Sequence, residues 1–178
     1  MAFFNKFPLL AYDIKNNENY KLLPDILRRV KLRSSVRSSS MLFDVYDVKE
    51  GEKPEDVAFK WFGDAELHWV ILMTNNVTDR YYGWPMNSVQ FQAFLEDKYD
   101  NPDGIHHYES PSESGRTTGQ GPTDFSHLVE VNSDTPNASI ISNREFEERE
   151  QDKKRSIRLL DQSFLGDFIE EFNNLISR

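Results

Sequence analysis

The sequence predicts an α+β fold with a small strand–helix–helix–strand core near the middle of the chain. Residues 41–51 (MLFDVYDVKEG) alternate their side chains as a β-strand does, and the run ends at Gly51. Two helix-length segments follow, and Gly63 separates them. The final segment, DQSFLGDFIEEFNNLISR, repeats apolar residues at helical spacing and therefore predicts an amphipathic C-terminal helix. An N-terminal arm and a β-rich loop region complete the expected architecture.

The two central helices carry recognisable start and stop signals. Pro54 suits the first position of a helix, and Gly63 suits the residue that ends it. Asp64 can cap the second helix, expected over Ala65 to Thr74, and the Asn75-Asn76 pair stops that helix. The second helix is apolar on every side, through Leu67, Trp69, Val70, Ile71, Leu72 and Met73. Such a helix must be covered all round, by its own chain or by a partner.

We expect four segments along the chain. Residues 1–40 form an irregular N-terminal arm and a short basic helix that begins at Pro24, with a linker or strand edge at residues 34–40. Residues 41–100 form the core domain, in which residues 77–86 are a loop or a short strand. Residues 101–145 form an excursion with strands at IHHYE, HLVEV and ASII and an exposed loop at Pro111 to Asp124. Residues 146–178 form a polar linker and the C-terminal helix.

The C-terminal helix is expected to offer a wide apolar stripe, with Asp161 or Ser163 as its cap. The stripe consists of Phe164, Leu165, Phe168, Ile169, Phe172, Leu175 and Ile176. The residues before it, Glu147 to Ser156, are polar and contain pairs at helical spacing such as Glu145–Arg149 and Glu150–Lys154. This polar separation favours docking of the helix on a partner or in a second small cluster.

Charge and composition narrow the class of protein. The chain has a formal net charge of -9, yet Lys21 to Ser40 holds six basic residues and one acidic residue. That basic segment lacks interleaved aromatic residues, so docking on an acidic protein surface is favoured over nucleic-acid binding. No cysteine is present, which excludes disulfides and thiolate sites. The longest apolar run, WVILM, is far too short for a membrane span, so we expect a soluble protein made inside the cell.

No pattern of catalytic or metal-binding residues is found. The four histidines are His68, His106, His107 and His127. His106 and His107 are adjacent, so on a regular strand their rings face opposite ways and do not share a metal. There is no HExxH motif, no nucleophile elbow and no phosphate-binding glycine loop. We therefore expect neither an enzyme nor a cofactor.

The segment YDVKEGEKPEDVAFKWFGDAELHWVILMTNN resembles the LysM pattern, a strand followed by two helices, the second ending in Asn, and a later strand. This resemblance implies a LysM-like core. LysM modules usually bind N-acetylglucosamine glycans through two loops, one of which carries Gly-Asp/Glu-Thr. Here that loop reads Gly51-Glu52-Lys53-Pro54, and the missing Thr argues against sugar binding.

A resemblance to the small baseplate wedge protein of contractile-tailed (myovirus, T4-like) phages covers more of the chain. It rests on WVILMTNN followed by YYGW, on LPDILRRVKLR before them and on DKKRSIRLLDQSFLGDFIEEFNNLI at the end. The resemblance implies a structural subunit that docks on other wedge proteins, in an assembly of six wedges around the tail hub. It also implies a place in the virion tail baseplate, assembled in the host cytoplasm. A LysM-type cell-wall glycan-binding module is the alternative.

Under this hypothesis, aromatic side chains are the expected contact residues for neighbouring subunits. The candidates are Trp61, Trp69, Tyr81, Tyr82, Trp84, Phe164, Phe168 and Phe172. Neither nucleic acid nor membrane is an expected partner.

Overall fold

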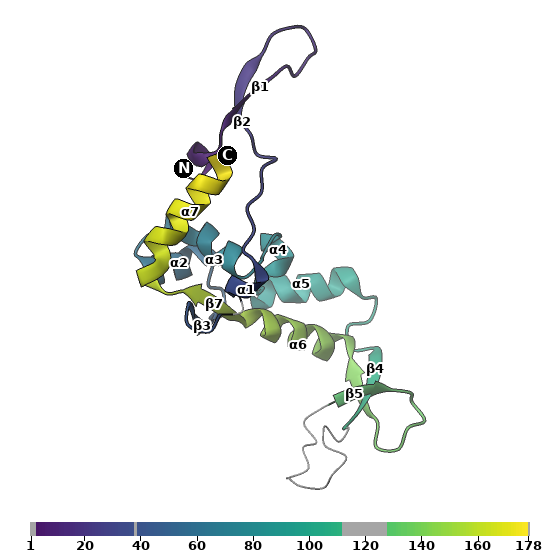
Figure 1. Ribbon diagram of the computed structural model, residues 1–178. Coiled ribbons are helices and arrows are strands. Elements are labelled where there is room, and N and C mark those ends of the chain that lie inside the picture. Colours follow the sequence, from purple (N-terminus) through teal and green to yellow (C-terminus); the bar gives the residue numbers. More distant parts are fainter. Residues whose placement is uncertain (1–2, 38, 112–127, 178) are drawn as a thin grey trace. The chain divides into compact units, whose positions relative to one another are not determined.

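The computed structural model describes residues 3–37, 39–111 and 128–177 and confirms the predicted α+β class (Figure 1). The described strands form three separate small sheets. The chain divides into two compact units: unit 1 comprises residues 1–85 and 154–178, and unit 2 comprises residues 86–153. The four-segment division drawn from the sequence stays a prediction, and the contacts group the chain differently.

The central strand of unit 1 pairs with a strand from the far end of the chain. β3 (Phe43–Asp47) runs antiparallel to β7 (Ser156–Leu160), with Phe43 opposite Leu160. The expectation that the core closes within residues 41–100 is therefore wrong. Residues 77–86 supply a short helix, α4 (Arg80–Gly83), and the closing strand follows only after unit 2. The brief strand expected around Ile157 and Leu159 is the one that closes the core.

Helices α2 (Pro54–Phe62) and α3 (His68–Thr74) follow the start and stop signals of the sequence. Gly63 ends α2 with a φ of 78°, a left-handed conformation that glycine adopts without strain. The Asp64 carboxylate accepts the Glu66 N–H at 2.8 Å, and this cap begins a 3-10 turn, Ala65–Leu67, that leads into α3. Local signals thus fix both helices.

Asn75 joins the end of α3 to β7. Its side-chain N–H donates to the Arg158 carbonyl at 2.8 Å, and its side-chain oxygen accepts the Arg158 N–H at 2.8 Å. The amide therefore pairs with β7 as a neighbouring strand would, and it satisfies one residue of the strand's free edge. This contact explains why an asparagine ends the second helix of the core.

Helix α3 lies between two apolar clusters, which answers why it is apolar on every side. Ile71 belongs to the first cluster, together with Val48, Val57, Ala58, Trp84, Ile157 and Leu159. Trp69 and Val70 belong to the second cluster, together with Phe43, Leu160, Phe172 and Ile176. The chain itself therefore covers both sides of this helix.

The C-terminal helix α7 (Leu165–Ser177) supplies the outer layer of the second cluster. The Phe172 ring lies 4.5 Å from the Trp69 ring, centre to centre, and Phe172 and Ile176 are buried. Asp161 is the cap, accepting the Ser163 N–H at 2.7 Å at the start of a 3-10 turn, Gln162–Phe164. Of the two alternatives drawn from the sequence, docking on a partner or packing in a second cluster, Phe172 and Ile176 follow the second, and that cluster is shared with the strand–helix core.

The N-terminal segment forms a hairpin, where an irregular arm and a helix from Pro24 were expected. β1 (Leu9–Tyr12) pairs with β2 (Lys21–Pro24), after a 3-10 turn at Phe4–Lys6. Pro24 is the last residue of β2. A strand end tolerates proline, because the N–H that proline lacks is not needed there for pairing with another strand. The Asp25 carboxylate accepts the Leu27 N–H at 3.2 Å, so a turn forms there and no helix begins. A short helix, α1 (Ser34–Arg37), comes only afterwards.

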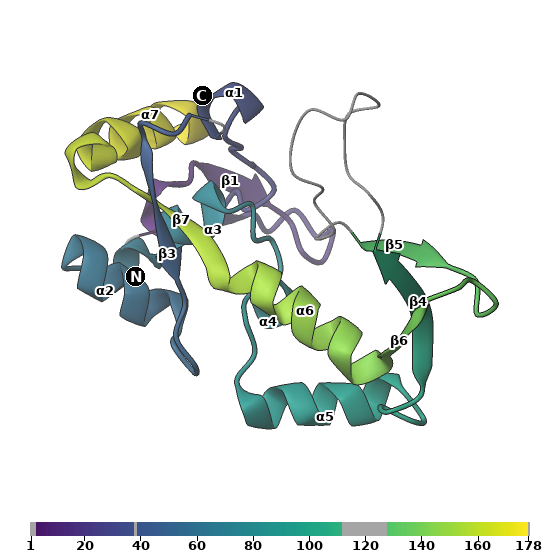
Figure 2. The same ribbon diagram turned by 90° about the horizontal axis from the view of Figure 1, so that it is seen from below.

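Unit 2 combines two helices with a three-stranded sheet (Figure 2). The three expected strands are confirmed as β4 (Ile105–Pro111), β5 (Leu128–Val131) and β6 (Ser139–Ser142), in the order β5-β4-β6. Helix α5 (Ser88–Lys98) precedes the sheet, and α6 (Asn143–Arg155) follows it where a polar linker was expected. Most of the loop expected at Pro111 to Asp124, and His127, lie outside the described residues.

Candidate functional site

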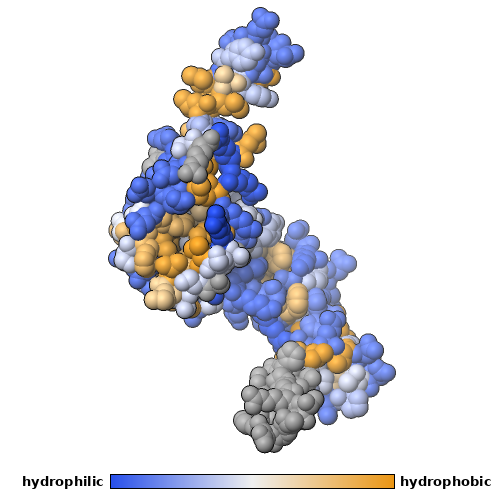
Figure 3. Space-filling view, in the orientation of Figure 1, coloured by the Kyte–Doolittle hydropathy of each residue, from blue (hydrophilic) through white to orange (hydrophobic). Residues whose placement is uncertain are grey.

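Among the described residues, the largest group of exposed apolar side chains lies on the β1–β2 hairpin and the turn after it. We call this group the hairpin patch: Leu9, Leu10, Tyr12, Ile14, Tyr20, Leu22, Leu23, Ile26 and Leu27. Figure 3 shows hydrophobic side chains over the strands of this hairpin and hydrophilic ones at its loop. Leu22 is 69% exposed and Leu27 is 84% exposed. Apolar groups gathered at this density mark a binding surface more often than scattered ones do.

The strand register sorts the hairpin patch into two faces. Leu9 pairs with Pro24 and Ala11 with Leu22, so these four residues share one entirely apolar face. The pairs Leu10–Leu23 and Tyr12–Lys21 share the other face. Both faces carry apolar side chains, so neither has the polar outer surface of a sheet that packs on one side only.

A cationic segment directly follows the hairpin patch. Arg29, Lys31 and Arg33 are exposed. Arg28, by contrast, pairs with Asp25 at 3.1 Å and donates to the Ile176 carbonyl at 3.3 Å, near the C-terminal end of α7. That carbonyl lies in the last turn of the helix, where cations are favoured.

Four of the aromatic residues expected to bind partners are occupied within unit 1. Trp69, Trp84 and Phe172 are buried. The Trp61 ring N–H donates to the Leu160 carbonyl at 2.9 Å, and the Trp84 ring N–H donates to the Glu52 carbonyl at 2.8 Å. Trp61 therefore fastens α2 to β7, and Trp84 fastens the end of α4 to the loop after β3.

The remaining expected aromatic residues differ in exposure. Tyr81 and Tyr82, both on α4, are 82% and 60% exposed. Phe164 is 39% exposed, whereas Phe168 is partly buried with its ring 6.0 Å from that of Trp69. Tyr81 therefore remains available for contact with a partner, and Phe164 keeps part of its ring exposed. Sequence reasoning missed the hairpin patch, although the paired runs LLAY and KLLP around a polar loop were a signal for it.

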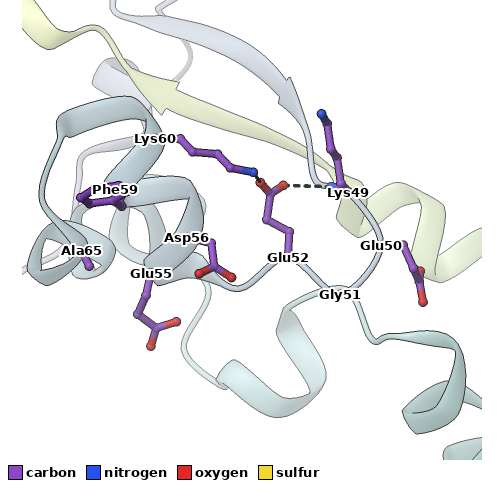
Figure 4. A pocket seen from close by; sticks show the side chains of 9 residues that line it. All are labelled: Lys49, Glu50, Gly51, Glu52, Glu55, Asp56, Phe59, Lys60 and Ala65. Carbon is purple, nitrogen blue, oxygen red and sulfur yellow. Dashed lines mark hydrogen bonds and ion pairs between the residues drawn. The ribbon is translucent and has the colours of Figure 1, made fainter.

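A shallow pocket lies beside the loop between β3 and α2, around Glu52 (Figure 4). The buried Glu52 carboxylate accepts hydrogen bonds from the Tyr46 hydroxyl at 2.9 Å, from the Lys49 N–H at 3.0 Å and from the Lys60 ammonium. Burial alone would raise the pKa of Glu52. The hydrogen bonds from Lys60 and the other donors outweigh burial and hold that pKa below its usual value.

The other acidic groups of this pocket are also engaged by the chain. Glu50 and Glu55 point away from Glu52 in Figure 4. Glu55 pairs with Arg80 at 2.8 Å, and Glu50 pairs with Arg155 at 3.1 Å. The carboxylate of the loop that resembles a sugar-binding loop is therefore turned inward and holds the fold.

Unit 2 contains a polar network around Glu109 that corrects one expectation. The Arg149 guanidinium lies 2.7 Å from the Glu109 carboxylate and holds the pKa of that carboxyl below its usual value. His107 Nε2 contacts Glu109 at 2.9 Å, and His107 Nδ1 lies 2.7 Å from His106 Nδ1. The two rings do not face opposite ways, because a bulge between Ile105 and His107 interrupts the alternation of the strand.

The described residues hold no group of three or more His, Cys, Asp or Glu side chains placed to bind a metal ion. Within residues 3–37, 39–111 and 128–177, no helix combines the length and the apolar content that crossing a membrane requires. The arrangement as a whole consists of packed aromatic residues, internally paired acids and an exposed apolar hairpin. Such an arrangement is suited to protein–protein contact.

Comparison with known proteins gives two findings. The model of a protein family described as Base plate wedge protein 53 matches residues 1–117. The baseplate wedge protein gp53 of Enterobacteria phage T4 is 30% identical over 104 residues, which is 58% of this chain and 53% of that relative. The match thus spans about half the length of the relative. The family match includes the hairpin patch and α2 to α5, whereas β7, α6 and α7 lie beyond it.

Proposed function

Because the chain belongs to the Base plate wedge protein 53 family, we propose that it is a structural subunit of the tail baseplate wedge in a contractile-tailed bacteriophage. The observation that carries this proposal is the family match over residues 1–117. The matched range contains the hairpin patch, the largest group of apolar side chains that the described chain leaves exposed. The baseplate of the virion is therefore its proposed location, with assembly in the host cytoplasm.

The role we propose is docking on other wedge subunits, in an assembly of six wedges around the tail hub. Exposed apolar groups on the hairpin and Tyr81 on α4 support this role, because the described chain leaves them open to water. The pairing of β3 with β7 supports it too, since it joins distant parts of the chain into one body that can carry contacts.

We propose that the protein has no catalytic activity. Among the residues that the structure describes, the carboxylates with lowered pKa values are Glu52, Glu109 and Asp161, and each is held by donors of its own chain. A general acid or base must instead reach a substrate proton. Structural use of these groups fits a subunit that has to keep its shape within an assembly.

A nonsense mutation in the gene, introduced into the phage, tests the proposal directly. In a host that does not suppress the mutation, electron microscopy of lysates is expected to show heads and incomplete baseplates, without complete tails. Supplying the protein from a plasmid should restore complete virions. Complete virions formed without the protein would contradict a structural role in the wedge.

The alternative function is binding of cell-wall glycan by a LysM-like module. The strand–helix–helix–strand order of β3, α2, α3 and β7 favours it, although residues 86–153 separate the last strand from the rest. The inward-facing Glu52 carboxylate and the missing Thr count against it. We expect that the purified protein is not retained on peptidoglycan or chitin. Saturable retention that chito-oligosaccharides compete away would favour the alternative.

A further inference from the structure

We propose that the hairpin patch and the cationic segment formed by Arg29, Lys31 and Arg33 together make one docking arm for an acidic protein surface. The proposal rests on the proposed function and names the surface by which this subunit binds a neighbour. The partner we infer is a protein of different sequence. It presents apolar side chains and a free strand edge to the hairpin, and carboxylates to the three cations.

The hairpin needs a partner for its own stability. β1 and β2 pair only with each other among the described strands, so each has a free edge. All eight strand residues are exposed. An isolated two-stranded hairpin is marginally stable at best in water, and a free edge accepts a further strand readily. Addition of a strand from a partner would complete the sheet by a common mode of recognition.

The face formed by Leu9, Ala11, Leu22 and Pro24 is the expected contact face. It carries no charged or hydroxyl group, whereas the opposite face holds Tyr12 and Lys21. Leu9 and Leu22 are 66% and 69% exposed, compared with 46% and 38% for Leu10 and Leu23 on the other face. The more apolar face is thus also the more exposed one, and a partner that covers it removes the most apolar area from water.

The charge of the arm identifies the chemistry of the partner. Arg29, Lys31 and Arg33 are exposed, and the structure records no ion pair for them among the described residues. Three unpaired cations in five residues are attracted to acidic surfaces over a Debye length of about 8 Å at physiological salt. They also stand out on a chain whose net charge is -9. An acidic partner would be steered to the hairpin by this segment.

The same charges argue against pairing of two hairpins from two copies of this chain. A symmetric dimer brings the same surface of each copy together, so the cationic segments at the hairpin base would lie close to each other. Like charges that face each other are destabilising. The charge pattern therefore favours a heterologous partner.

Site-specific photocrosslinking in assembled baseplates tests the identity of the occupant. A benzophenone amino acid at Leu22 is expected to crosslink to a different polypeptide, in a peptide that mass spectrometry shows to lie near acidic residues. The matched control places the same group at Val89, which is 78% exposed on α5. It should not crosslink to that peptide. Crosslinks from Leu22 to a second copy of this chain, to its own chain or to nothing would each overturn the proposal.

Charge reversal tests the cationic segment. We expect that Arg29→Glu, Lys31→Glu and Arg33→Glu together lower incorporation into baseplates at least tenfold, while the thermal unfolding of the purified protein is unchanged. The control reverses two exposed lysines outside the arm, Lys49→Glu and Lys53→Glu, and should assemble normally. Normal assembly of the triple variant would contradict the docking-arm proposal. If the nonsense mutant lacks baseplates, the proposed function would still stand. Complete baseplates in the nonsense mutant would instead contradict the proposed function itself.

Discussion

The interior of unit 1 and the interior of unit 2 are stabilised by different kinds of contact. Unit 1 buries two apolar clusters rich in aromatic residues on either side of α3. Unit 2 has three buried apolar side chains among its described residues, Met86, Leu95 and Ile141, and buries Glu147 and Gln151 beside them. Apolar burial contributes stability in proportion to area, whereas buried polar groups mainly penalise arrangements that leave them unpaired. Unit 1 is therefore expected to be the more stable one.

The polar contacts of unit 2 lie along α6. The Glu147 carboxylate accepts a hydrogen bond from the Tyr99 hydroxyl at 2.8 Å and pairs with the Lys98 ammonium. The Gln151 side chain accepts the Met86 N–H at 3.0 Å. From the sequence alone this helix is interpreted as a polar linker, because the residues that bury its polar side chains are distant in the chain. A polar helix can thus line the interior of a small unit when most of its buried polar atoms find partners, although the Gln151 side-chain nitrogen is buried without one.

The largest expected effect is in unit 1. Trp69→Ala should lower the free energy of unfolding by about 3–5 kcal/mol, because it removes a buried aromatic side chain from the second cluster. All three tryptophans lie in unit 1, so their fluorescence during urea unfolding follows this unit alone. Tyr82→Ala is the matched control, since Tyr82 is 60% exposed. A loss below about 1 kcal/mol would mean that the second cluster contributes little.

A smaller effect is expected in unit 2. Glu147→Ala should destabilise that unit by about 1–3 kcal/mol, because Tyr99 and Lys98 lose a buried acceptor. Hydrogen exchange of the α5 and α6 amides is the appropriate measurement, and the tryptophan fluorescence transition should stay unchanged. The control is Glu148→Ala on the exposed side of the same helix. An equal shift of the tryptophan transition would show that the two units unfold as one.

Acid is expected to weaken unit 1 through Glu52. The pKa of Glu52 is lowered in the folded state, so its contribution to stability is complete above the unfolded pKa, which is near 4.5 for an ordinary glutamate. That contribution is lost as the pH falls from there through the lower folded pKa. Glu52→Gln should therefore reduce stability at neutral pH and flatten this part of the pH dependence. Urea midpoints measured between pH 3 and pH 7 test it, and an unchanged slope would contradict the role given to Glu52.

The smallest expected effect concerns an exposed aromatic residue. Tyr81→Ser should change the free energy of unfolding by about 0.5 kcal/mol or less, because this side chain is 82% exposed in the free protein. Thermal unfolding measures the effect, with Trp84→Phe as a buried counterpart that should cost more. A large loss of stability in Tyr81→Ser would place the Tyr81 side chain in the core.

Much of the local structure was predictable, because its causes lie within a few residues. Pro54, Gly63 and Asp64 mark the ends of the central helices by their own backbone preferences and side chains. The stripe of α7 is visible because apolar spacing belongs to the helix itself. The sequence did not distinguish buried from exposed residues among the predicted contact residues, since nothing local to Trp69 or Tyr81 shows that the first is buried and the second exposed. Whether an aromatic residue is buried depends on segments that pack on it from elsewhere.

The features that escaped prediction depend on distant or unusual pairing. β7 closes the core only after unit 2, and no local signal links it to β3. Pro24 suits the start of a helix and the end of a strand equally, and pairing with Leu9 decides between them. The shared side of His106 and His107 results from a bulge, which strict alternation does not anticipate.

Hydrogen exchange of the free protein and of the protein in purified baseplates tests the central claim most directly, that unit 1 is preformed and docks through its hairpin. We expect the β1 and β2 amides to exchange fast in the free protein and to be protected in the baseplate. The amides of α3 and α7 should be protected to the same degree in both states, because the chain itself covers them. Fast exchange of α7 in the free protein, with protection gained only on assembly, would contradict this account.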